Sequence, residues 1–159
     1  MIDRALTVAY LLATPRMLRE MTRDCSGSQA ATPPKPGAWS IVDVVRHLVE
    51  GDRDTLLPRL RRLLVEERPT FAVFDPQAWE HERDHRARDF AADLAAFTRA
   101  RADTLAFLER VPADAAGRLG VSGHFGPLTL LQYATHELDH DLEHLGQMRD
   151  CIGALPSRG

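Results

Sequence analysis

The stretch from Tyr133 to Met148, which reads YATHELDHDLEHLGQM, constrains the fold more than any other part of the chain. Its apolar residues recur with the period of an α-helix, so it predicts a long amphipathic helix. The apolar face comprises Leu130, Leu131, Ala134, Leu138, Leu142, Leu145 and Met148. His136, His140 and His144 follow one another at intervals of four residues and flank this face. This placement suits side chains that reach into a space between packed helices.

Three further amphipathic segments predict three more helices. We expect them to span about 2–23, 40–66 and 87–110, and we expect the histidine-bearing helix to begin at Thr129. Proline lacks a backbone N–H, so Pro15 should kink or split the first helix and Pro58 should kink the second. Four such helices predict an all-α fold.

Connections of roughly fifteen residues separate the predicted helices. Each is rich in proline, glycine or polar residues and is expected to be a loop or a partly ordered segment. They span 24–38, 68–84 and 112–127. Phe71, Phe74 and Trp79 should pack the middle connection onto the helices. The predicted architecture is therefore a four-helix bundle with long inter-helix connections, formed by a single domain over residues 1–159 with a core of about 2–152.

The composition is that of an ordinary globular protein and excludes several functional classes. The chain has 159 residues, of which 44% are hydrophobic and 27% charged, with a net charge of −3. The chain lacks a basic stripe with interleaved aromatic residues, so the sequence gives little support to nucleic-acid binding. It also lacks an apolar run of about 18 residues, so no membrane span is predicted. We interpret the N-terminal MIDRALTVAYLLATP as a first helix and not as a signal peptide. Cys25 and Cys151 do not make a disulfide framework, so we expect a reduced, cytoplasmic protein.

One histidine outside the fourth helix, His47, stands at the edge of the apolar stripe of the second helix. Ser40 and Asp43 form the pattern of a capping box where this helix begins. Gly51 follows His47 one turn later and leaves space beside the imidazole. Ring nitrogens of histidines four residues apart can converge on a single metal ion. Each of these histidines taken alone also fits an ordinary polar position satisfied by a hydrogen bond.

Several other polar residues fit ordinary surface positions. His81 and His85 lie among charged residues and are expected on a solvated surface. Arg99 and Arg101, on the third helix, are expected in solvent or in surface ion pairs. Cys25 has no evident base paired with it and is interpreted as an ordinary thiol.

The segment HELDH, from His136 to His140, matches the H-E-x-x-H pattern of zinc proteases. In such enzymes the two histidines bind zinc and the glutamate activates water. We do not adopt this interpretation because no downstream ligand pattern fits, only 19 residues follow His140, and no sheet is expected beside the helix.

Three segments together resemble one known family: GAWSIVDVVRHLVEGDRD, RLRRLLVEERPTFAVFDPQAW and HFGPLTLLQYATHELDHDLEHLGQMR. A Trp-Ser pair opens a helix and is followed by a histidine seven residues after the serine. A second motif, H-x-x-x-H-x-G-Q, is formed by His140, His144, Gly146 and Gln147. Over about residues 37–149 the chain is similar to the DinB/YfiT superfamily, and most similar to its DinB-like branch.

The resemblance implies a four-helix bundle that holds a divalent metal ion, zinc or nickel, between one histidine of the second helix and two of the fourth. Carried over residue by residue, these ligands are His47, His140 and His144. His136 is then left to orient His140 or to line the pocket. Further candidates for the surroundings of the ion are Glu137, Asp141, Gln147 and His124. Homodimers are common in the family, so the resemblance also implies a homodimer.

Three imidazole ligands leave at least one coordination position open, which is typical of catalytic or ligand-binding metal sites. Proteins that resemble this chain include thiol S-transferases that use bacillithiol or mycothiol, a thiol-dependent maleylpyruvate isomerase, and metal-dependent hydrolases. The leading hypothesis is a metal-dependent thiol S-transferase that acts on small electrophilic molecules, with a low-molecular-weight thiol as co-substrate. Two alternatives remain: a metal-dependent hydrolase that uses a metal-bound water, and a non-catalytic metal- or small-ligand-binding protein associated with stress.

Overall fold

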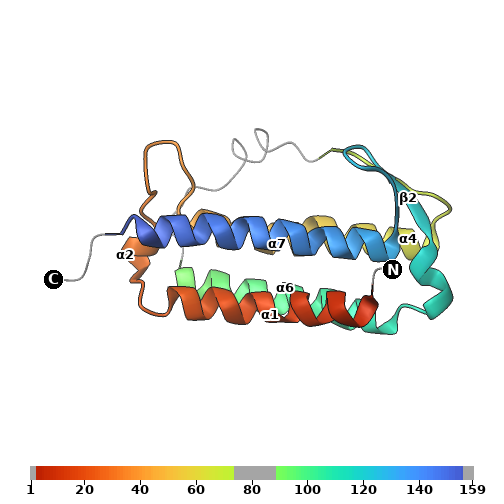
Figure 1. The fold of residues 1–159 in the computed structure, drawn as a ribbon, viewed down its shortest axis with the longest axis horizontal. Helices are drawn as coiled ribbons and strands as arrows, with labels where there is room; N and C mark the ends of the chain where they lie inside the picture. The colour runs from red at the N-terminus through yellow and green to blue at the C-terminus, as the bar shows by residue number, and fades with distance from the viewer. Residues whose placement is uncertain (1–2, 74–88, 156–159) are drawn as a thin grey trace.

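Four long helical units pack side by side in the computed structural model, which describes residues 3–73 and 89–155 (Figure 1). The first unit is α1 (Arg4–Thr22), the third is α6 (Phe90–Arg110) and the fourth is α7 (Leu130–Gly153). The second unit consists of three consecutive elements: α3 (Ile41–Glu50), the π-helix η1 (Gly51–Leu56) and α4 (Leu57–Val65). Both α1 and α3 pack against α6 and α7. Two short helices lie in the connections, α2 (Gly27–Ala30) and η2 (Ala113–Gly117). The predicted all-α four-helix bundle is confirmed.

Capping boxes define the start of the two helices that carry the candidate metal ligands. Ser40 accepts a hydrogen bond from the backbone N–H of Asp43 at 3.3 Å, and the Asp43 carboxylate accepts one from the backbone N–H of Ser40 at 2.9 Å. Thr129 and Gln132 make the same reciprocal pair at the start of α7, at 3.1 and 2.8 Å. Each box satisfies two N–H groups that have no partner within the helix, so both helices begin at defined residues.

Pro15 does not split α1, which continues as one helix from Arg4 to Thr22. A proline cannot donate the backbone hydrogen bond to the carbonyl four residues earlier, which here belongs to Leu11. The guanidinium of Arg101 on α6 donates to this carbonyl instead, with Nη1 3.2 Å from the oxygen. A bond from a neighbouring helix thus replaces the one that Pro15 cannot make.

The predicted distortion at Pro58 takes the form of a widened turn just before it. The N–H of Leu57 donates to the carbonyl of Asp52, five residues earlier, which is the π-helical pattern. Pro58 then occupies the beginning of α4, where a missing N–H costs little. The wide turn η1 follows directly after the helical segment that carries His47, so the distortion lies next to the candidate site.

Two of the connections contain short strands, and our expectation that no sheet lies beside the fourth helix is wrong. The strands are β1 (Thr70–Phe71), β2 (Leu119–Ser122) and β3 (Gly126–Thr129). β1 pairs in parallel with β2, with Thr70 opposite Val121, and β2 pairs antiparallel with β3. A Cβ atom at Gly120 would lie 2.7 Å from Cδ2 of Leu63, so glycine permits this sheet to approach α4. The sheet covers the end of the bundle where α7 begins (Figure 1).

The core consists of two apolar clusters with a polar layer between them. One cluster includes Leu11, Leu56, Leu60, Leu63, Phe71, Leu105, Leu108 and Leu130. The other includes Leu18, Ile41, Val44, Val45, Leu48, Phe97, Leu145 and Met148. The polar layer comprises one buried residue from each helical unit: Thr14, Asp52, Arg101 and Asp141. On every unit this residue lies between positions of the two clusters, so the layer crosses the whole bundle.

Some predicted features lie outside the described residues, namely Phe74, Trp79, His81, His85 and the first residues of the predicted third helix. Phe71, by contrast, is 3% exposed and belongs to the core. In the two ranges that the structure describes, no helix combines the length and apolar character that a membrane span requires.

Candidate metal centre

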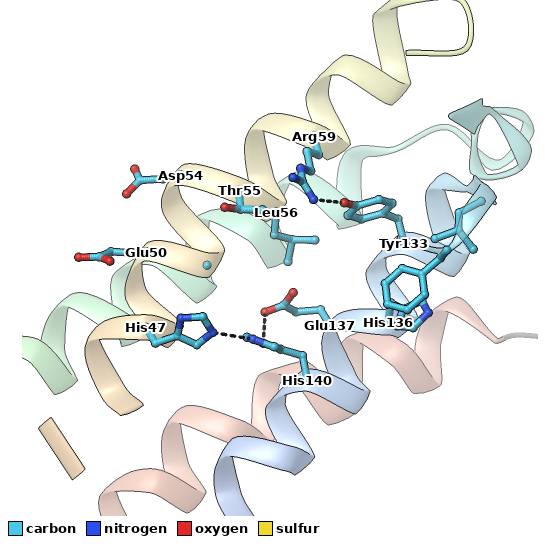
Figure 2. Close-up of a pocket in the computed structure, with 13 residues that line it drawn as sticks. His47, Glu50, Asp54, Thr55, Leu56, Arg59, Tyr133, His136, Glu137 and His140 are labelled. Atoms are coloured by element: carbon cyan, nitrogen blue, oxygen red, sulfur yellow. Dashed lines mark hydrogen bonds and ion pairs between the residues drawn. The ribbon is translucent and has the colours of Figure 1, made fainter. Parts of the chain in front are cut away.

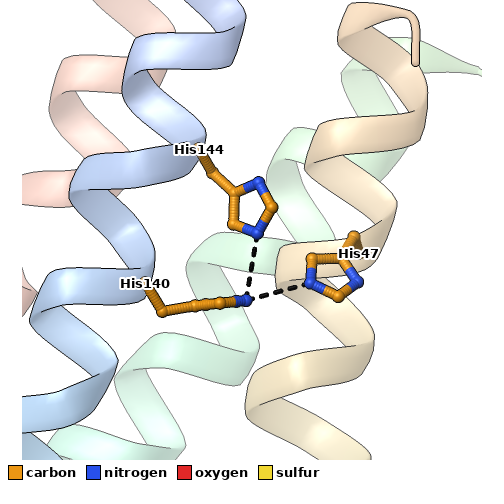
Figure 3. Close-up of side chains that lie close together, drawn as sticks. All are labelled: His47, His140 and His144. Atoms are coloured by element: carbon orange, nitrogen blue, oxygen red, sulfur yellow. Dashed lines mark hydrogen bonds between the residues drawn. The ribbon is translucent and has the colours of Figure 1, made fainter. Parts of the chain in front are cut away.

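Three histidines from two helical units meet between α3 and α7 (Figure 3). The Nε2 atom of His140 lies 2.9 Å from Nε2 of His47 and 3.0 Å from Nε2 of His144. His47 is 7% exposed and His144 is 5% exposed. The structure therefore brings together the three residues that the sequence indicated as metal ligands. They are referred to below as the histidine cluster.

Two neighbours shape the space around the histidine cluster. Trp39, which precedes α3, stacks on His144 with ring centroids 5.9 Å apart and tilts against His47 at 5.0 Å. On the other side, a Cβ atom at Gly51 would lie 3.8 Å from Cε1 of His140. The tryptophan therefore restrains two of the rings, while Gly51 borders the third, at a distance where a Cβ atom would make an ordinary van der Waals contact.

The Nδ1 atoms of two of the rings face acceptors on α7. His144 donates from Nδ1 to Oε1 of Gln147 at 2.8 Å. Nδ1 of His140 lies 3.3 Å from Oε1 of Glu137, a close contact without the alignment of a good hydrogen bond. An acceptor at the second nitrogen of a ligating histidine fixes its tautomer and ring orientation. Gln147 and Glu137, both expected near the ion, are in place to turn two Nε2 atoms toward the cluster.

Burial, together with the neighbouring rings of His144 and His140, lowers the pKa of His47 to about 3. Burial and the adjacent His140 also lower the pKa of His144. Burial likewise opposes the charged form of His140, but its contact with Glu137 outweighs this effect and raises the pKa of that ring. Two of the three rings are therefore neutral at pH 7, and a neutral imidazole has a lone pair that can bind a metal ion.

The donor set fits a divalent transition metal. The three imidazole nitrogens lie within 4.8 Å of one another, and such ligands suit zinc, nickel and copper. In the described part of the chain, Glu137, His140 and Asp141 also bring one ligand atom each within 4.8 Å. Asp141 is nevertheless a poor ligand because Arg101 and Thr14 already donate hydrogen bonds to its oxygens. Metal binding by the histidine cluster is the better-supported prediction.

The expectation that Arg101 lies in solvent or in a surface ion pair is wrong, because its side chain is 1% exposed. Nε donates to Asp52 at 2.7 Å, and Nη1 and Nη2 donate to Asp141 at 2.5 and 2.9 Å. Thr14 donates its hydroxyl to the same carboxylate of Asp141 at 2.6 Å. Burial opposes the charge of Arg101, but the hydrogen bonds that it donates to Asp141 and the charge of Asp52 raise its pKa overall. Asp141, expected beside the ion, thus belongs to the polar layer.

A pocket of about 310 Å³ lies beside the histidine cluster, between α7 and the unit formed by α3, η1 and α4 (Figure 2). His47 and His140 line one end, and Arg59 and Tyr133 line the other. Glu137 lies between the two ends. The volume falls at the lower end of the range for small-molecule sites. The candidate metal centre therefore adjoins a space that can hold a substrate.

The two remaining histidines of the predicted site lie away from the group of three nitrogens. His136 lines the pocket, where its ring stacks on Phe125 with centroids 3.6 Å apart. His124 is exposed, and its ring contacts Phe125 edge-on at 4.4 Å. His136 is thus part of the pocket wall, one of the two positions we expected for it, and His124 lies outside the lining.

The sequence analysis missed the burial of Arg101 and the meeting of Arg59 with Tyr133. Arg101 carried a signal, because it lies four residues from both Phe97 and Leu105 and so interrupts the apolar stripe of α6. No sequence pattern around Arg59 or Tyr133 indicated that they would meet. Their contact depends on how α4 packs against α7, and the spacing of residues within either helix does not report that packing.

Comparison with known sequences identifies a family and several relatives. A family model described as the DinB superfamily matches residues 10–148. A Bacillus subtilis protein named "Putative metal-dependent hydrolase YfiT" is 28% identical over 88 residues, which are 55% of this chain and 49% of that protein. A Bacillus licheniformis protein of corresponding description is 32% identical over 88 residues, with the same 55% and 49% coverage. The chain thus spans about half the length of the relatives it matches.

Two solved structures share the fold. One is YfiT from Bacillus subtilis, which is described as a probable metal-dependent hydrolase with an unusual four-helix bundle topology. It superposes with a TM-score of 0.81 and 21% sequence identity, and the match covers 94% of this chain and 85% of that one. TT2238, described as a four-helix bundle protein, gives a TM-score of 0.66 and 21% identity, covering 92% and 98%. At this level of identity the likeness establishes the architecture of the bundle.

Proposed function

Because the chain belongs to the DinB superfamily, we propose that it holds a divalent metal ion on His47, His140 and His144 and hydrolyses a small molecule in the adjoining pocket. The observation that carries this proposal is the convergence of three ring nitrogens at one end of that pocket. The description of its relatives as metal-dependent hydrolases supports the reaction type. Zinc and nickel both suit three imidazoles, so the ligand set alone does not select between them.

The contacts around the histidine cluster indicate which part of the chemistry a bound ion would supply and which part the protein would supply. When bound, a divalent ion supplies Lewis acidity, which lowers the pKa of a coordinated nucleophile toward ~7. The chain supplies orientation: Gln147 holds Nδ1 of His144 at 2.8 Å, and Trp39 stacks on the same ring. These contacts fix the tautomer and the orientation of the His144 ring, so that its Nε2 atom faces the other two rings.

Glu137 is the side chain best placed to move a proton. Its Oε1 atom faces Nδ1 of His140, and Figure 2 shows the other carboxylate oxygen directed into the pocket. Burial favours the protonated acid, but the contacts with His140 and Arg101 lower the pKa of Glu137 overall. The group is therefore a carboxylate at pH 7 and can accept the proton of a nucleophile that attacks a bound substrate.

Thiol S-transfer is the second candidate, because three imidazole ligands leave a coordination position that a thiol could occupy in place of water. The pocket of about 310 Å³ beside the cluster would then hold the electrophile. Under this alternative Glu137 would accept the proton of the thiol, so the protein residues keep the same roles. Only the identity of the nucleophile differs between the two candidates.

The first experiment measures the metal content of protein purified without a metal-affinity tag, for the wild type and for His144→Ala. About one ion per chain is expected in the wild type and a loss of that ion in the variant, because three ligands become two. His136→Ala is the matched control, since this histidine lies on the same helix but outside the group of three nitrogens. A wild type that takes up no zinc or nickel would refute the proposal.

The second experiment assays turnover of small esters and lactones by metal-loaded protein, with and without added cysteine. Turnover that needs the metal but not the thiol supports hydrolysis, and turnover that needs both supports S-transfer. Glu137→Gln should lower kcat by about 10²-fold or more, because the amide cannot accept the proton. An unchanged kcat in Glu137→Gln would remove Glu137 from this role.

A further inference from the structure

The end of the pocket opposite the histidine cluster contains an arginine held in a fixed orientation. Arg59 on α4 donates one hydrogen bond to the hydroxyl of Tyr133 on α7 and another, at 2.9 Å, to the carbonyl of Ala72. The guanidinium carbon lies 5.9 Å from the ring centroid of Tyr133 and 5.5 Å from that of Phe71. Aromatic faces and hydrogen bonds on both sides therefore hold this guanidinium in place.

This end of the pocket has unused capacity to donate hydrogen bonds. A guanidinium has five N–H donors, and the two bonds above leave others available to a ligand. The Tyr133 hydroxyl accepts from Arg59 and keeps its own proton to donate, and burial raises the pKa of Tyr133, which favours this protonated form. Among residues 3–73 and 89–155, no carboxylate forms an ion pair with Arg59.

The acidic residues that border the pocket do not offset the charge of Arg59. Figure 2 shows the carboxylates of Glu50 and Asp54 directed away from the interior, and Asp54 pairs with Arg53 at 2.6 Å. Glu137 lies closer to the histidine cluster, where its Oε1 atom contacts His140. The pocket is therefore positive at the end formed by Arg59 and Tyr133.

The two ends are separated by a mostly apolar wall. Leu56, Phe125 and Leu128 line the pocket between or beside them. Tyr133 and His140 are seven residues apart on α7, which corresponds to about 10 Å along the helix axis. A ligand that reaches both ends must therefore have an apolar body a few bonds long.

We propose that this pocket selects small molecules that have a carboxylate at one end, bound by Arg59 and Tyr133, and a reacting group at the other end, beside the histidine cluster. The planar fork of an arginine matches the two oxygens of a carboxylate, and the short apolar wall matches an acyl or aryl spacer. This inference rests on the proposed metal-dependent function, because it requires the histidine cluster to be the reacting end.

The test uses monohydroxamates of straight-chain dicarboxylic acids of increasing length, with zinc-loaded protein and calorimetric measurement of Kd. A hydroxamate chelates zinc and so anchors each probe at the histidine cluster. The matched series replaces the carboxylate by a primary amide, which has similar size but no charge. We expect the carboxylate to bind at least about tenfold more tightly than the amide at one intermediate chain length.

Variants then identify the group that recognises the carboxylate. Arg59→Met should abolish the preference for carboxylate over amide, and Tyr133→Phe should reduce it while preserving the ring that packs beside Arg59. Arg61→Met is the matched control, because Arg61 is exposed on the same helix and does not line the pocket. Zinc content is measured for every variant, so a lost preference in a protein that still holds zinc is specific to the pocket.

The outcomes separate this inference from the proposed function. Equal binding of the two series to the wild type would overturn the inference and leave the metal centre intact. A preference that survives in both Arg59→Met and Tyr133→Phe would also overturn it, because the carboxylate would then bind elsewhere. Failure of both series to bind zinc-loaded protein would refute the proposed function, and this inference with it.

Discussion

The histidine cluster and the polar layer meet on α7, where His140 and Asp141 are adjacent, yet only the polar layer is held together by ion pairs among its own members. In the polar layer, Arg101 donates to Asp52, to Asp141 and to the carbonyl of Leu11. Only Oδ1 of Asp52 lacks a hydrogen-bond partner there among the described residues. In the histidine cluster, by contrast, three Nε2 atoms face one another at 2.9 and 3.0 Å.

The difference suggests that the match of charges and hydrogen bonds within a group, and not its burial alone, distinguishes the polar layer from the proposed metal site. A buried charge is tolerated when groups of opposite charge and matching hydrogen-bond geometry surround it, as around Arg101. The two neutral rings of the histidine cluster direct Nε2 atoms toward His140, and a metal ion at this point could bind the lone pair of each ring. Four predictions test this distinction.

The largest effect is expected from breaking the polar layer with Arg101→Met. The change leaves Asp52 and Asp141 buried without their cation, which should lower the free energy of unfolding by about 3–5 kcal/mol. Urea denaturation measures this loss. Arg99→Met, at an exposed position of the same helix, should change stability by less than about 0.5 kcal/mol. Equal stability of Arg101→Met and the wild type would mean that the layer does not stabilise the fold.

Adjacent substitutions on α7 should separate the two clusters. Zinc at a hundred times its Kd should stabilise the wild type by about 2.7 kcal/mol. His140→Ala should lose this response to zinc. Asp141→Asn should be less stable without zinc but should keep the response. A thermal melt of each variant with and without zinc checks the prediction, which fails if Asp141→Asn also loses the response.

A smaller effect is expected when the histidine cluster keeps its ligands but loses an orienting contact. Gln147→Leu removes the acceptor at Nδ1 of His144 and should weaken zinc binding by about 10–100-fold. Competition with a chromogenic chelator measures the affinity. Arg149→Leu, also exposed near the end of α7, is the control and should leave the affinity unchanged. The same affinity in both variants would show that Gln147 does not orient the ring.

The smallest effect concerns the pH dependence of the metal-free protein. Because burial and the neighbouring rings lower the pKa of His47 from 6.5 to about 3, the unfolded chain binds a proton below pH 6.5 that the folded protein excludes. Stability should therefore be full above pH 6.5 and fall as the pH decreases toward 3, by at most about 1.4 kcal/mol per pH unit for this ring. The lowered pKa of His144 acts in the same direction, and the raised pKa of His140 opposes it.

His47→Gln should flatten this dependence, because glutamine does not titrate. The free energy of unfolding at pH 7.5 and 5.5, measured with a chelator present, gives the slope for the wild type and the variant. An equally steep slope in His47→Gln would assign the acid sensitivity to other groups.

Much of the fold was predictable because helix periodicity is a local property. Apolar residues at helical spacing indicated the four long units, and the Ser40–Asp43 pair indicated where α3 begins. The strands β1 and β2 were not predictable in the same way. Thr70 pairs with Val121, 51 positions later in the chain, and neither segment has a pattern of its own long enough to indicate a strand.

The sequence by itself determined which side chains could bind a metal and, through the resemblance of its motifs to the DinB/YfiT superfamily, which three to expect together. Only the tertiary structure decided which polar residues form ion pairs and hydrogen bonds with one another. The ion pairs of Arg101 reach residues 40 and 49 positions away, and Thr14 meets Asp141 across 127 positions. Helical spacing places a side chain on a face of its own helix, but its partner depends on how that helix packs against the others.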